Sequence, residues 1–402
     1  MTTAGIPASN LTADDELHWL ALHMVRGLGD RKAVQLLERF RTPQLVFRSS
    51  RSELEAAGLA GSVAQTIASG CSFEEAVEQH ERAKALGVAV IPVHDPRYPP
   101  LLREIYDPPL LLFARGRTEI LQSPMIAIVG TRRPTPYGVA VADRFGRELA
   151  EAGLVVTSGM ARGIDTSAHR GALASVGETI AVFGCGVDVI YPAENRKLAD
   201  EISAKGLLLS EFPIGTPGHP QHFPIRNRIV SGMSLGVVVV EGAEYSGSAI
   251  TARLAMDQGR EVFAVPGNIT SKMSFGPNLL IRQGATLVQK WSDITAELQV
   301  KDRQRLSDAV RKRMIEKGLL EPESFGPAQA SLPLPGSQSP AAALAQQVLA
   351  HLQPEEAVDL DGLIESLAGT SSSELIAVLF DLEMEGLVRQ LPGKRFARVW
   401  QD

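Results

Sequence analysis

Two closely spaced arginines follow a loop rich in proline and glycine, in the segment FPIGTPGHPQHFPIRNRIVSG at residues 212–232. Arg226 and Arg228 flank Asn227 where this loop gives way to a helical pattern, and no apolar pattern explains either arginine. A helix N-terminus presents backbone N–H groups to an anion, and a guanidinium adds charged donors whose geometry matches phosphate. The segment therefore predicts phosphate binding.

Four more loops offer anion donors, and each follows a short apolar run. They contain Gly130-Thr131-Arg132-Arg133, Ser158 to Gly163, Gly184 to Lys197, and Glu241 to Ser248. Arginine or lysine occurs in four of the five loops, while glycine and serine expose backbone and hydroxyl donors. Structural turns would explain some of the glycines without a ligand. Five successive strand ends with such donors nevertheless exceed what packing requires.

Three familiar fingerprints are absent or incomplete in this sequence. No GxxxxGK[ST] motif occurs, so ATP hydrolysis lacks its usual lysine. Gly184-Cys185-Gly186 begins like a dinucleotide loop but lacks the third glycine and the helix behind it. His219 and His222 have HxxH spacing without an acidic partner nearby, which favours a solvated loop over a zinc site. We therefore predict no catalytic residue, no metal and no cofactor.

Buried strands and helices alternate from Pro124 onward. Seven short apolar runs are separated by helical patterns such as VAVADRFGRELAEAG, which predicts an α/β fold with an extended, Rossmann-like, doubly wound parallel sheet. Such folds bind ligands at the carboxyl ends of their strands. Two further strands should precede these runs and extend the sheet, around a proline-rich crossover in which helix is blocked. The seven runs are MIAIVG, LVVTSG, ETIAVFG, GLLLSEF, LGVVVVEG, EVFAVPG and ATLVQ.

Helical periodicity extends from Glu16 to about Ala68, within the first predicted domain at residues 1–85. In VRGLGDRKAVQLLERF, a Gly-Leu-Gly turn at residues 27–29 precedes an amphipathic run. This arrangement is typical of a SAM-like or helix-hairpin-helix domain, whose turn aims backbone N–H groups at a DNA phosphate. A small helical bundle with a glycine at a helix start explains the pattern equally well. Both interpretations remain open at this point.

The last hundred residues follow the sheet domain, which we place at residues 86–297. Residues 298–340 combine a basic helical stretch with a linker rich in proline, serine and glycine. Residues 341–402 predict three helices and a β-hairpin, the layout of a winged helix, with an N-cap within Ser371 to Ser373. Its third helix carries no Lys or Arg, which would repel a duplex. We expect this domain to bind protein, or to contact DNA weakly through Lys394, Arg395 and Arg398. The acidic residues of that helix are Glu374, Asp381, Glu383 and Glu385.

Charge and composition set further bounds. The formal net charge is −6, and residues 341–402 alone carry all of it, whereas residues 124–297 are balanced. A neutral domain still binds phosphate if its arginines converge. Cys71 and Cys185 lack disulfide-framework or zinc spacing, which favours a reducing compartment. Without a signal peptide or a run of about 18 apolar residues, the expected location is cytoplasmic, with no membrane association.

Six motifs extend almost continuously from about Val93 to Val288. They are IVGTRRPTPYG, VTSGMARGIDTSAHRGAL, GVDVIYPAENRKL, LLSEFPIGTPGHPQHFPIRNRIVSG, VVVVEGAEYSGSAITARLAMDQGREVFAVPGN and FGPNLLIRQGA. With these motifs the central segment closely resembles the DprA/Smf family of DNA-processing proteins. The resemblance implies a non-enzymatic protein of natural transformation and recombination, which binds and protects single-stranded DNA and loads RecA onto it. It also implies a homodimer through the edge of this domain, involving the helix around Ala249 to Asp257 and the following strand.

The resemblance and the strand-end loops together predict the nucleic-acid contacts. The resemblance points to the loop at Gly130–Arg132, to Asn195 with Lys197, and to Arg226 with Arg228. Phe223 and Tyr245 lie beside these loops and could stack on bases, although either could equally be a core ring. The predicted nucleic-acid-binding residues are Gly130, Thr131, Arg132, Arg133, Ser158, Gly159, Arg162, Gly186, Asn195, Lys197, Phe223, Arg226, Asn227, Arg228, Ser246 and Gly247.

The main alternative is a nucleotide-binding enzyme. Related sheet proteins hydrolyse nucleoside monophosphates with a Pro-Gly-Gly-x-Gly-Thr loop and a glutamate. The corresponding loop here, EGAEYSGSAIT, lacks the Gly-Gly pair, and no glutamate lies on the following helix. Phosphoribohydrolase activity is therefore the less favoured hypothesis, and nicotinamide chemistry is weakened further by the incomplete GxGxxG.

Overall fold

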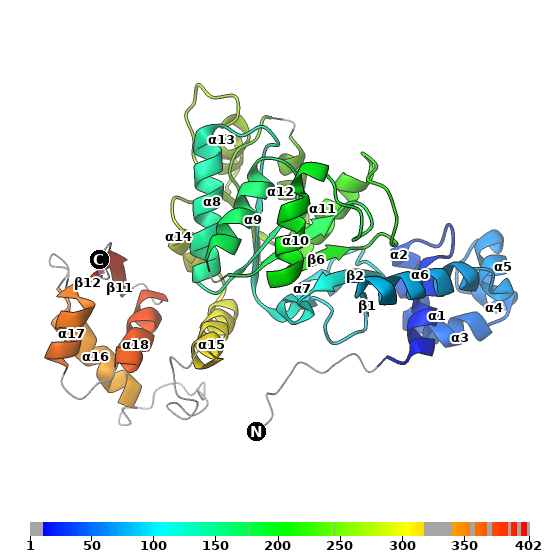
Figure 1. The fold of residues 1–402 in the computed structure, drawn as a ribbon, viewed down its shortest axis with the longest axis horizontal. Helices are drawn as coiled ribbons and strands as arrows, with labels where there is room; N and C mark the ends of the chain where they lie inside the picture. The colour runs from blue at the N-terminus through cyan, green and yellow to red at the C-terminus, as the bar shows by residue number, and fades with distance from the viewer. Residues whose placement is uncertain are drawn as a thin grey trace. The chain divides into compact units, whose positions relative to one another are not determined.

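The computed structural model describes residues 11–175, 177–244, 246–316, 340–353, 358–367, 372–384, 387–391 and 395–399. The chain divides into two compact units, one ending at Trp291 and the other starting at Ser292 (Figure 1). The first unit holds the N-terminal helices and the large sheet, and the second holds the winged helix. Among the described helices, none has both the length and the apolar character of a membrane-spanning segment.

Short capped helices form the N-terminal part of the first unit. Thr12 and Ser50 each accept a hydrogen bond from the backbone three residues on, and Asp15 and Glu53 return one to the cap backbone. These capping boxes define where the helices begin. The apolar side chains of these helices are buried in the core that also contains the sheet. The helices are α1 (Ala13–His23), α2 (Asp30–Phe40), α3 (Pro43–Arg48), α4 (Arg51–Ala56), α5 (Gly61–Ser69) and α6 (Phe73–Leu86).

A nine-stranded sheet follows, in the order β1-β2-β6-β5-β4-β3-β7-β8-β9. Neighbouring strands from β6 to β9 are parallel, which confirms the predicted doubly wound sheet. Each of the seven apolar runs forms one strand. A strand covered on both faces needs a nearly continuous apolar sequence, which explains the runs from β3 to β8, whereas β9 is a partly exposed edge strand. These strands are β3 (Met125–Val129), β4 (Val155–Ser158), β5 (Thr179–Phe183), β6 (Leu207–Ser210), β7 (Gly236–Val239), β8 (Glu261–Ala264) and β9 (Thr286–Leu287).

Two antiparallel strands extend the sheet at its other edge. The pair β1 (Ala89–Pro92) and β2 (Leu111–Gly116) is joined to the sheet through β6, as predicted. The expectation that prolines exclude helix between these strands is wrong for a single turn, α7 (Pro100–Arg103). Proline is tolerated in the first turn of a helix because the N–H group there has no intrahelical partner.

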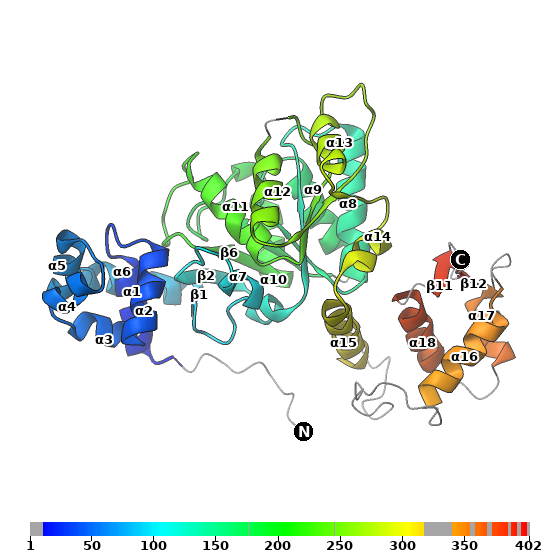
Figure 2. The same cartoon turned by 180° about the vertical axis from the view of Figure 1, so that it is seen from behind.

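Helices cover both faces of the sheet, as Figures 1 and 2 show from opposite sides. Helices α8, α9 and α10 pack together on one face, and α11 and α12 pack together on the other. The direction of winding reverses between β3 and β7, which makes this the switch point of the sheet. The bounds are α8 (Pro136–Glu151), α9 (Ile164–Ala174), α10 (Arg196–Lys205), α11 (His222–Gly232), α12 (Gly247–Asp257) and α13 (Phe275–Arg282).

The second unit contains the predicted winged helix with a core of its own. The predicted three helices and hairpin are confirmed as α16 to α18 with β11 and β12, and β10 adds a third strand beside β12. Ser371 of the predicted N-cap lies outside the described residues, and α18 begins at Ser372 with Glu374 in its first turn. The elements are α15 (Val300–Glu316), α16 (Pro340–His351), β10 (Val358–Asp359), α17 (Leu360–Ser366), α18 (Ser372–Met384), β11 (Val388–Leu391) and β12 (Arg395–Arg398).

Candidate nucleic-acid interface

Loops that follow β3, β4 and β5 converge at one edge of the sheet. These strands are parallel neighbours, so their carboxyl ends lie together as predicted. Helix α11 reaches the same edge from the opposite face, where Arg226 donates to a carbonyl of β5. These elements enclose a small pocket of about 30 Å³. The pocket is lined by Arg132, Gly159, Ala161, Arg162, Tyr191, Pro192, Phe223 and Arg226.

Arg226 lies at the floor of this pocket and is only 4% exposed. Its Nη1 donates to the carbonyl oxygen of Val182 at 3.0 Å, while its buried Nε finds no acceptor among the described residues. The guanidinium crosses directly over Gly159, where an added Cβ would lie 1.6 Å from Nη1. Glycine is therefore required at this strand end so that the arginine can enter.

A buried acid balances part of the Arg226 charge. One carboxylate oxygen of Asp165 accepts from the backbone N–H groups of Gly159 and Ala161 at 3.1 and 3.3 Å. Burial lowers the pKa of Arg226, and the attraction of Asp165 opposes that effect. The charge of nearby Arg132 lowers the pKa further. An anion in the pocket would relieve this repulsion between the two arginines.

His169 belongs to the buried polar layer near Arg226. Its Nδ1 lies 2.7 Å from Oγ1 of Thr179, whose single hydroxyl proton is donated to the carbonyl of Val156. We therefore assign the ring proton to Nδ1. Burial lowers the pKa of His169 to about 3, and the positive charge of Arg226 acts in the same direction. The imidazole is neutral in the folded protein at neutral pH.

Cations and aromatic rings form the rim of the pocket. Arg132 is exposed, and its guanidinium carbon lies 5.5 Å from the ring centroid of Phe223. The rings of Phe223 and Tyr191 are 5.2 Å apart and tilted by 31°. Arg162 pairs with Glu194 at 2.8 Å, with side chains 58% and 56% exposed. Because water screens such an exposed pair, a phosphate can displace the carboxylate at little cost.

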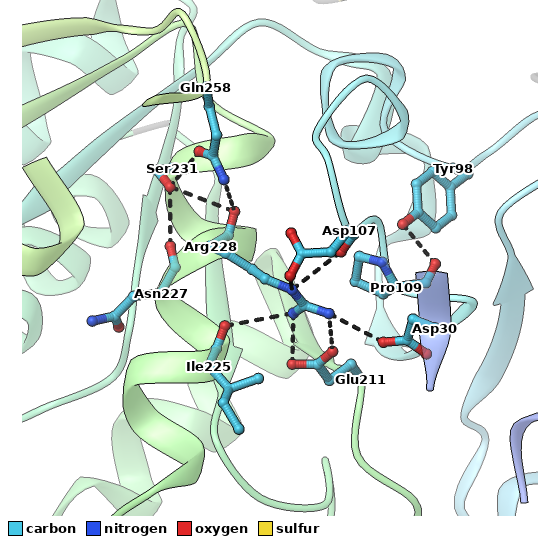
Figure 3. Close-up of polar contacts among 10 residues, drawn as sticks. All are labelled: Asp30, Tyr98, Asp107, Pro109, Glu211, Ile225, Asn227, Arg228, Ser231 and Gln258. Atoms are coloured by element: carbon cyan, nitrogen blue, oxygen red, sulfur yellow. Dashed lines mark hydrogen bonds and ion pairs between the residues drawn. The ribbon is translucent and has the colours of Figure 1, made fainter. Parts of the chain in front are cut away.

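Arg228, which the sequence also predicts to bind phosphate, does not line this pocket, and its guanidinium pairs with carboxylates. Figure 3 shows it surrounded by carboxylates, and its side chain is 9% exposed. It binds both carboxylate oxygens of Glu211 at 2.8 and 2.7 Å, and also contacts Asp107 and Asp30 at 3.1 Å. Although burial alone would lower it, the pKa of Arg228 is raised above its ordinary value by these three carboxylates.

Several other predicted residues serve the scaffold. Asn195 is buried, and its amide nitrogen donates to the carbonyl of Met160 and the hydroxyl of Thr166. Ser158 is fully buried and donates to the carbonyl of Ile128 in β3. Gly130 and Gly186 lie where a Cβ would meet neighbouring atoms at 2.5 to 2.6 Å. Their backbone positions remain at the strand ends, but the side chains of Asn195 and Ser158 hold loops together.

The fifth predicted loop does not reach the pocket. Its Glu241 is 2% exposed and accepts from the backbone N–H and the hydroxyl of Thr135, the N-cap of α8, at 2.9 and 2.6 Å. A carboxylate of the chain itself thus occupies the helix start beside the switch point, where nucleotide-binding folds place a phosphate. Ser246 caps α12 and pairs with Ser248, and Gly247 is exposed. Tyr245 lies outside the described residues.

Comparison with known proteins decides the family. A family model described as DNA recombination-mediator protein A matches residues 89–299, and one described as DprA winged helix domain matches residues 332–394. Protein Smf from Synechocystis sp. is 32% identical over 401 residues, which cover 96% of this chain and 99% of that protein. The chain belongs to the DprA/Smf family.

Two further relatives agree with this assignment. DNA processing protein DprA from Bacillus subtilis is 47% identical over 213 residues, covering 53% of this chain and 72% of that protein. The X-ray structure of DprA from Streptococcus pneumoniae superposes with a TM-score of 0.59 at 36% identity. That match covers 70% of this chain and 98% of the solved one. The predicted DprA/Smf resemblance is confirmed.

Four other predicted residues of this DprA/Smf chain do not line the pocket. Arg133 and Lys197 are exposed, and Thr131 and Asn227 are half-buried. Sequence reasoning missed Tyr191, which is 46% exposed and stands over the pocket beside Phe223. An aromatic residue in a strand-end loop was the available signal, within the family motif GVDVIYPAENRKL.

A wider groove over α8 and α9 lacks the same chemistry. It has a volume of about 550 Å³, and Asp143 and Arg170 are its charged residues. These opposite charges do not converge on an anion. Among the described residues, no group of three His, Cys, Asp or Glu side chains is arranged to hold a metal.

Proposed function

We propose that this protein binds single-stranded DNA at the pocket over β3, β4 and β5. The observation that carries the proposal is Arg226, a buried guanidinium at the pocket floor whose Nε has no acceptor among the described residues. Exposed Arg132 and Arg162 stand above it, so three positive charges converge on one small volume. Such convergence focuses the field on an anion even in a domain without net positive charge.

The dimensions of the pocket favour a DNA strand over a free nucleotide. About 30 Å³ accommodates a few water-sized groups such as phosphate oxygens, so a base would have to lie on the rim. Phe223 and Tyr191 offer rings there, and stacking contributes about 1–3 kcal/mol per base. A base inside a duplex has no free face for such stacking. The rim therefore selects unpaired strands. The sugar-phosphate backbone of the bound strand extends from the pocket toward exposed Arg133 and Lys197.

Within the family context, we propose a mediator of recombination in natural transformation. In this role the protein protects incoming single-stranded DNA in the cytoplasm and loads RecA recombinase onto it. The experiment is RecA strand exchange on DNA coated with single-strand-binding protein. Addition of this protein should shorten the lag before exchange, and a variant that cannot bind DNA should leave the lag unchanged. An unshortened lag with the wild-type protein would refute RecA loading.

We also propose a homodimer through the β9 edge of the sheet. Large apolar side chains on β9, on α12 and α13 and in the loop after β8 are exposed, each by at least 44%. An exposed apolar surface is typical of an association site. Sedimentation at increasing salt should show a dimer, and Ile250→Asp should yield monomers. The exposed residues are Ile250, Met256, Ile269, Phe275 and Leu287.

The DNA-binding proposal is tested by a salt titration with an oligothymidylate. The affinity should fall with a slope of about −0.7 in log–log coordinates for each phosphate contacted, or roughly −3 for four contacts. Arg132→Ala should remove one such contact. Arg144→Ala is the matched control, because Arg144 is an exposed arginine that pairs with Glu148 on α8. Equal affinity of both variants and the wild type would refute the site.

Catalysis is the competing hypothesis, and we propose that the protein has none. Nucleoside-monophosphate phosphoribohydrolase activity would need an anion site at the switch point, yet Glu241 already occupies the helix start there. Incubation with AMP should release no adenine above the uncatalysed rate. Release of adenine that depends on Glu241 would overturn this proposal.

A further inference from the structure

The segment that carries the pocket floor is held at both ends by the N-terminal helices. It runs from Ile214, in the loop after β6, to Arg228 in α11. Phe223 and Arg226, two of the residues that line the pocket, lie between these ends. Neither of the residues that hold the ends lines the pocket. Any displacement of the ends would therefore move the pocket floor without changing its chemistry.

Gln79 of α6 holds the first end. Its amide nitrogen donates to the carbonyl of Ile214 at 3.2 Å, and its amide oxygen accepts from the N–H group of the same residue at 2.9 Å. Gln79 is 7% exposed and Ile214 is 4% exposed, so water does not compete for these bonds. The next residue, Gly215, donates to Asp188 in the loop after β5 at 2.8 Å. The loop is thus fixed between α6 and a neighbouring strand-end loop.

Asp30 of α2 holds the second end. Its carboxylate lies 3.1 Å from Nη2 of Arg228, the same guanidinium that Glu211 binds with both oxygens (Figure 3). Asp30 is the first residue of the helix that follows the Gly27–Gly29 turn. A carboxylate at this helix start repels phosphate. This helix start therefore docks on the sheet domain through the ion pair between Asp30 and Arg228.

We propose that Asp30 and Gln79 are positioning residues for the single-stranded DNA pocket, an inference that rests on the proposed function. The N-terminal helices then contribute to DNA binding by fixing the Ile214 to Arg228 segment and not by touching the strand. Arg226 must pass against Gly159, where an added Cβ would lie 1.6 Å from Nη1. Since this fit tolerates little movement, only the braced conformation places the guanidinium at the pocket floor.

The direction of the change in DNA affinity distinguishes a positioning role of Asp30 from a purely electrostatic one. Asp30→Asn removes a negative charge, which by itself would strengthen the attraction of the protein for DNA. Loss of positioning predicts the opposite result, because the apparent dissociation constant rises as the binding-competent fraction falls. The number of phosphates contacted stays the same, so the salt slope stays the same.

The experiment uses the full chain with Asp30→Asn and Gln79→Ala combined. Oligothymidylate affinity is measured over a range of salt, and hydrogen exchange is followed in the segment from Ile214 to Arg226. Gln44→Ala is the matched control, because Gln44 donates to Asp15 within the N-terminal helices and does not line the pocket. Gln79→Ala alone serves as the second variant if the double variant does not fold.

The expected result is about tenfold weaker binding at unchanged salt slope, with faster exchange in this segment and no change in the control. Affinity within about twofold of the wild type despite faster exchange would overturn the inference and leave the DNA-binding proposal intact. A slope reduced by about 0.7 would also overturn it, since a phosphate contact would then have been lost. Failure of the wild-type protein to bind would instead refute the proposed function.

Discussion

Replacing Arg228 with methionine should destabilise the sheet unit without removing a DNA contact. The variant keeps much of the apolar stem but removes the guanidinium that neutralises Glu211. That carboxylate has a side-chain exposure of only 6%, compared with 24% for Asp30 and 47% for Asp107. Water can rehydrate the two aspartates, but it cannot reach Glu211. Most of the loss in the free energy of unfolding therefore arises from the buried, unpaired carboxylate of Glu211.

The size of the destabilisation follows from the low exposure of Glu211. Breaking a buried ion pair by removing one partner costs about 3–5 kcal/mol. For a unit of this size, each kcal/mol lowers the melting temperature by about 2–4 °C, so the transition should fall by at least about 6 °C. A second change, Glu211→Gln in the same chain, removes the unpaired charge. It should recover about 1–3 kcal/mol, because the effects of contacting residues are not additive.

Thermal unfolding of the full chain, followed by circular dichroism, measures these differences, and oligothymidylate titrations provide the second readout. Arg132→Ala is the matched control, because Arg132 is an exposed arginine and its loss should leave the melting temperature within about 2 °C. The reasoning would be refuted if Arg228→Met melted like the wild type and lowered the salt slope by about 0.7. Such a result would make Arg228 a phosphate ligand after all.

Three further predictions follow from the same structure. Arg132→Ala should reduce the salt slope of single-stranded DNA binding by about 0.7, and an unchanged slope would exclude a phosphate contact. Burial holds the pKa of His169 near 3, below its unfolded value of about 6.5. Between these two pH values only the unfolded state binds a proton at this histidine. The free energy of unfolding therefore falls by about 1.4 kcal/mol for each pH unit as the pH drops through this range. His169→Asn should therefore weaken the acid dependence of urea unfolding between about pH 6.5 and pH 4.5, and equal dependence in both proteins would contradict the assignment. Truncation after Glu316 keeps the basic helix α15 and removes the acidic winged helix, and it should leave duplex binding at moderate salt unchanged. A marked loss would show that this domain binds duplex DNA.

The strands were predictable because their signal is local. Each apolar run from β3 to β8 is short and bounded by a glycine or a polar residue, and burial on both faces demands such a run wherever it occurs in the chain. The convergence of the loops after β3, β4 and β5 also followed, since parallel strands place their carboxyl ends together. The turn at α7 was missed because proline ends most helices but is accepted in their first turn.

The roles of the polar side chains within the loops were less predictable. A polar side chain uses the same atoms whether it hydrogen-bonds to the rest of the protein or to a ligand. The side chains of Asn195 and Ser158 are buried and donate hydrogen bonds to backbone carbonyls of other segments. Glu241 filled the helix start that a phosphate would otherwise occupy. In each case the partner comes from a segment at least 30 residues away in the chain. Local sequence patterns do not specify such partners.

The two arginines of α11 show most directly what the sequence determines and what only the tertiary structure determines. The sequence by itself placed Arg226 and Arg228 at the start of a helix and made both of them candidates for phosphate. Successive residues of an α-helix turn by about 100°, so side chains two positions apart face nearly opposite directions. One direction leads to the pocket over β5, and the other leads to the carboxylates of Glu211, Asp107 and Asp30. Only the packing of α11 decided which arginine lines the pocket and which one pairs with carboxylates.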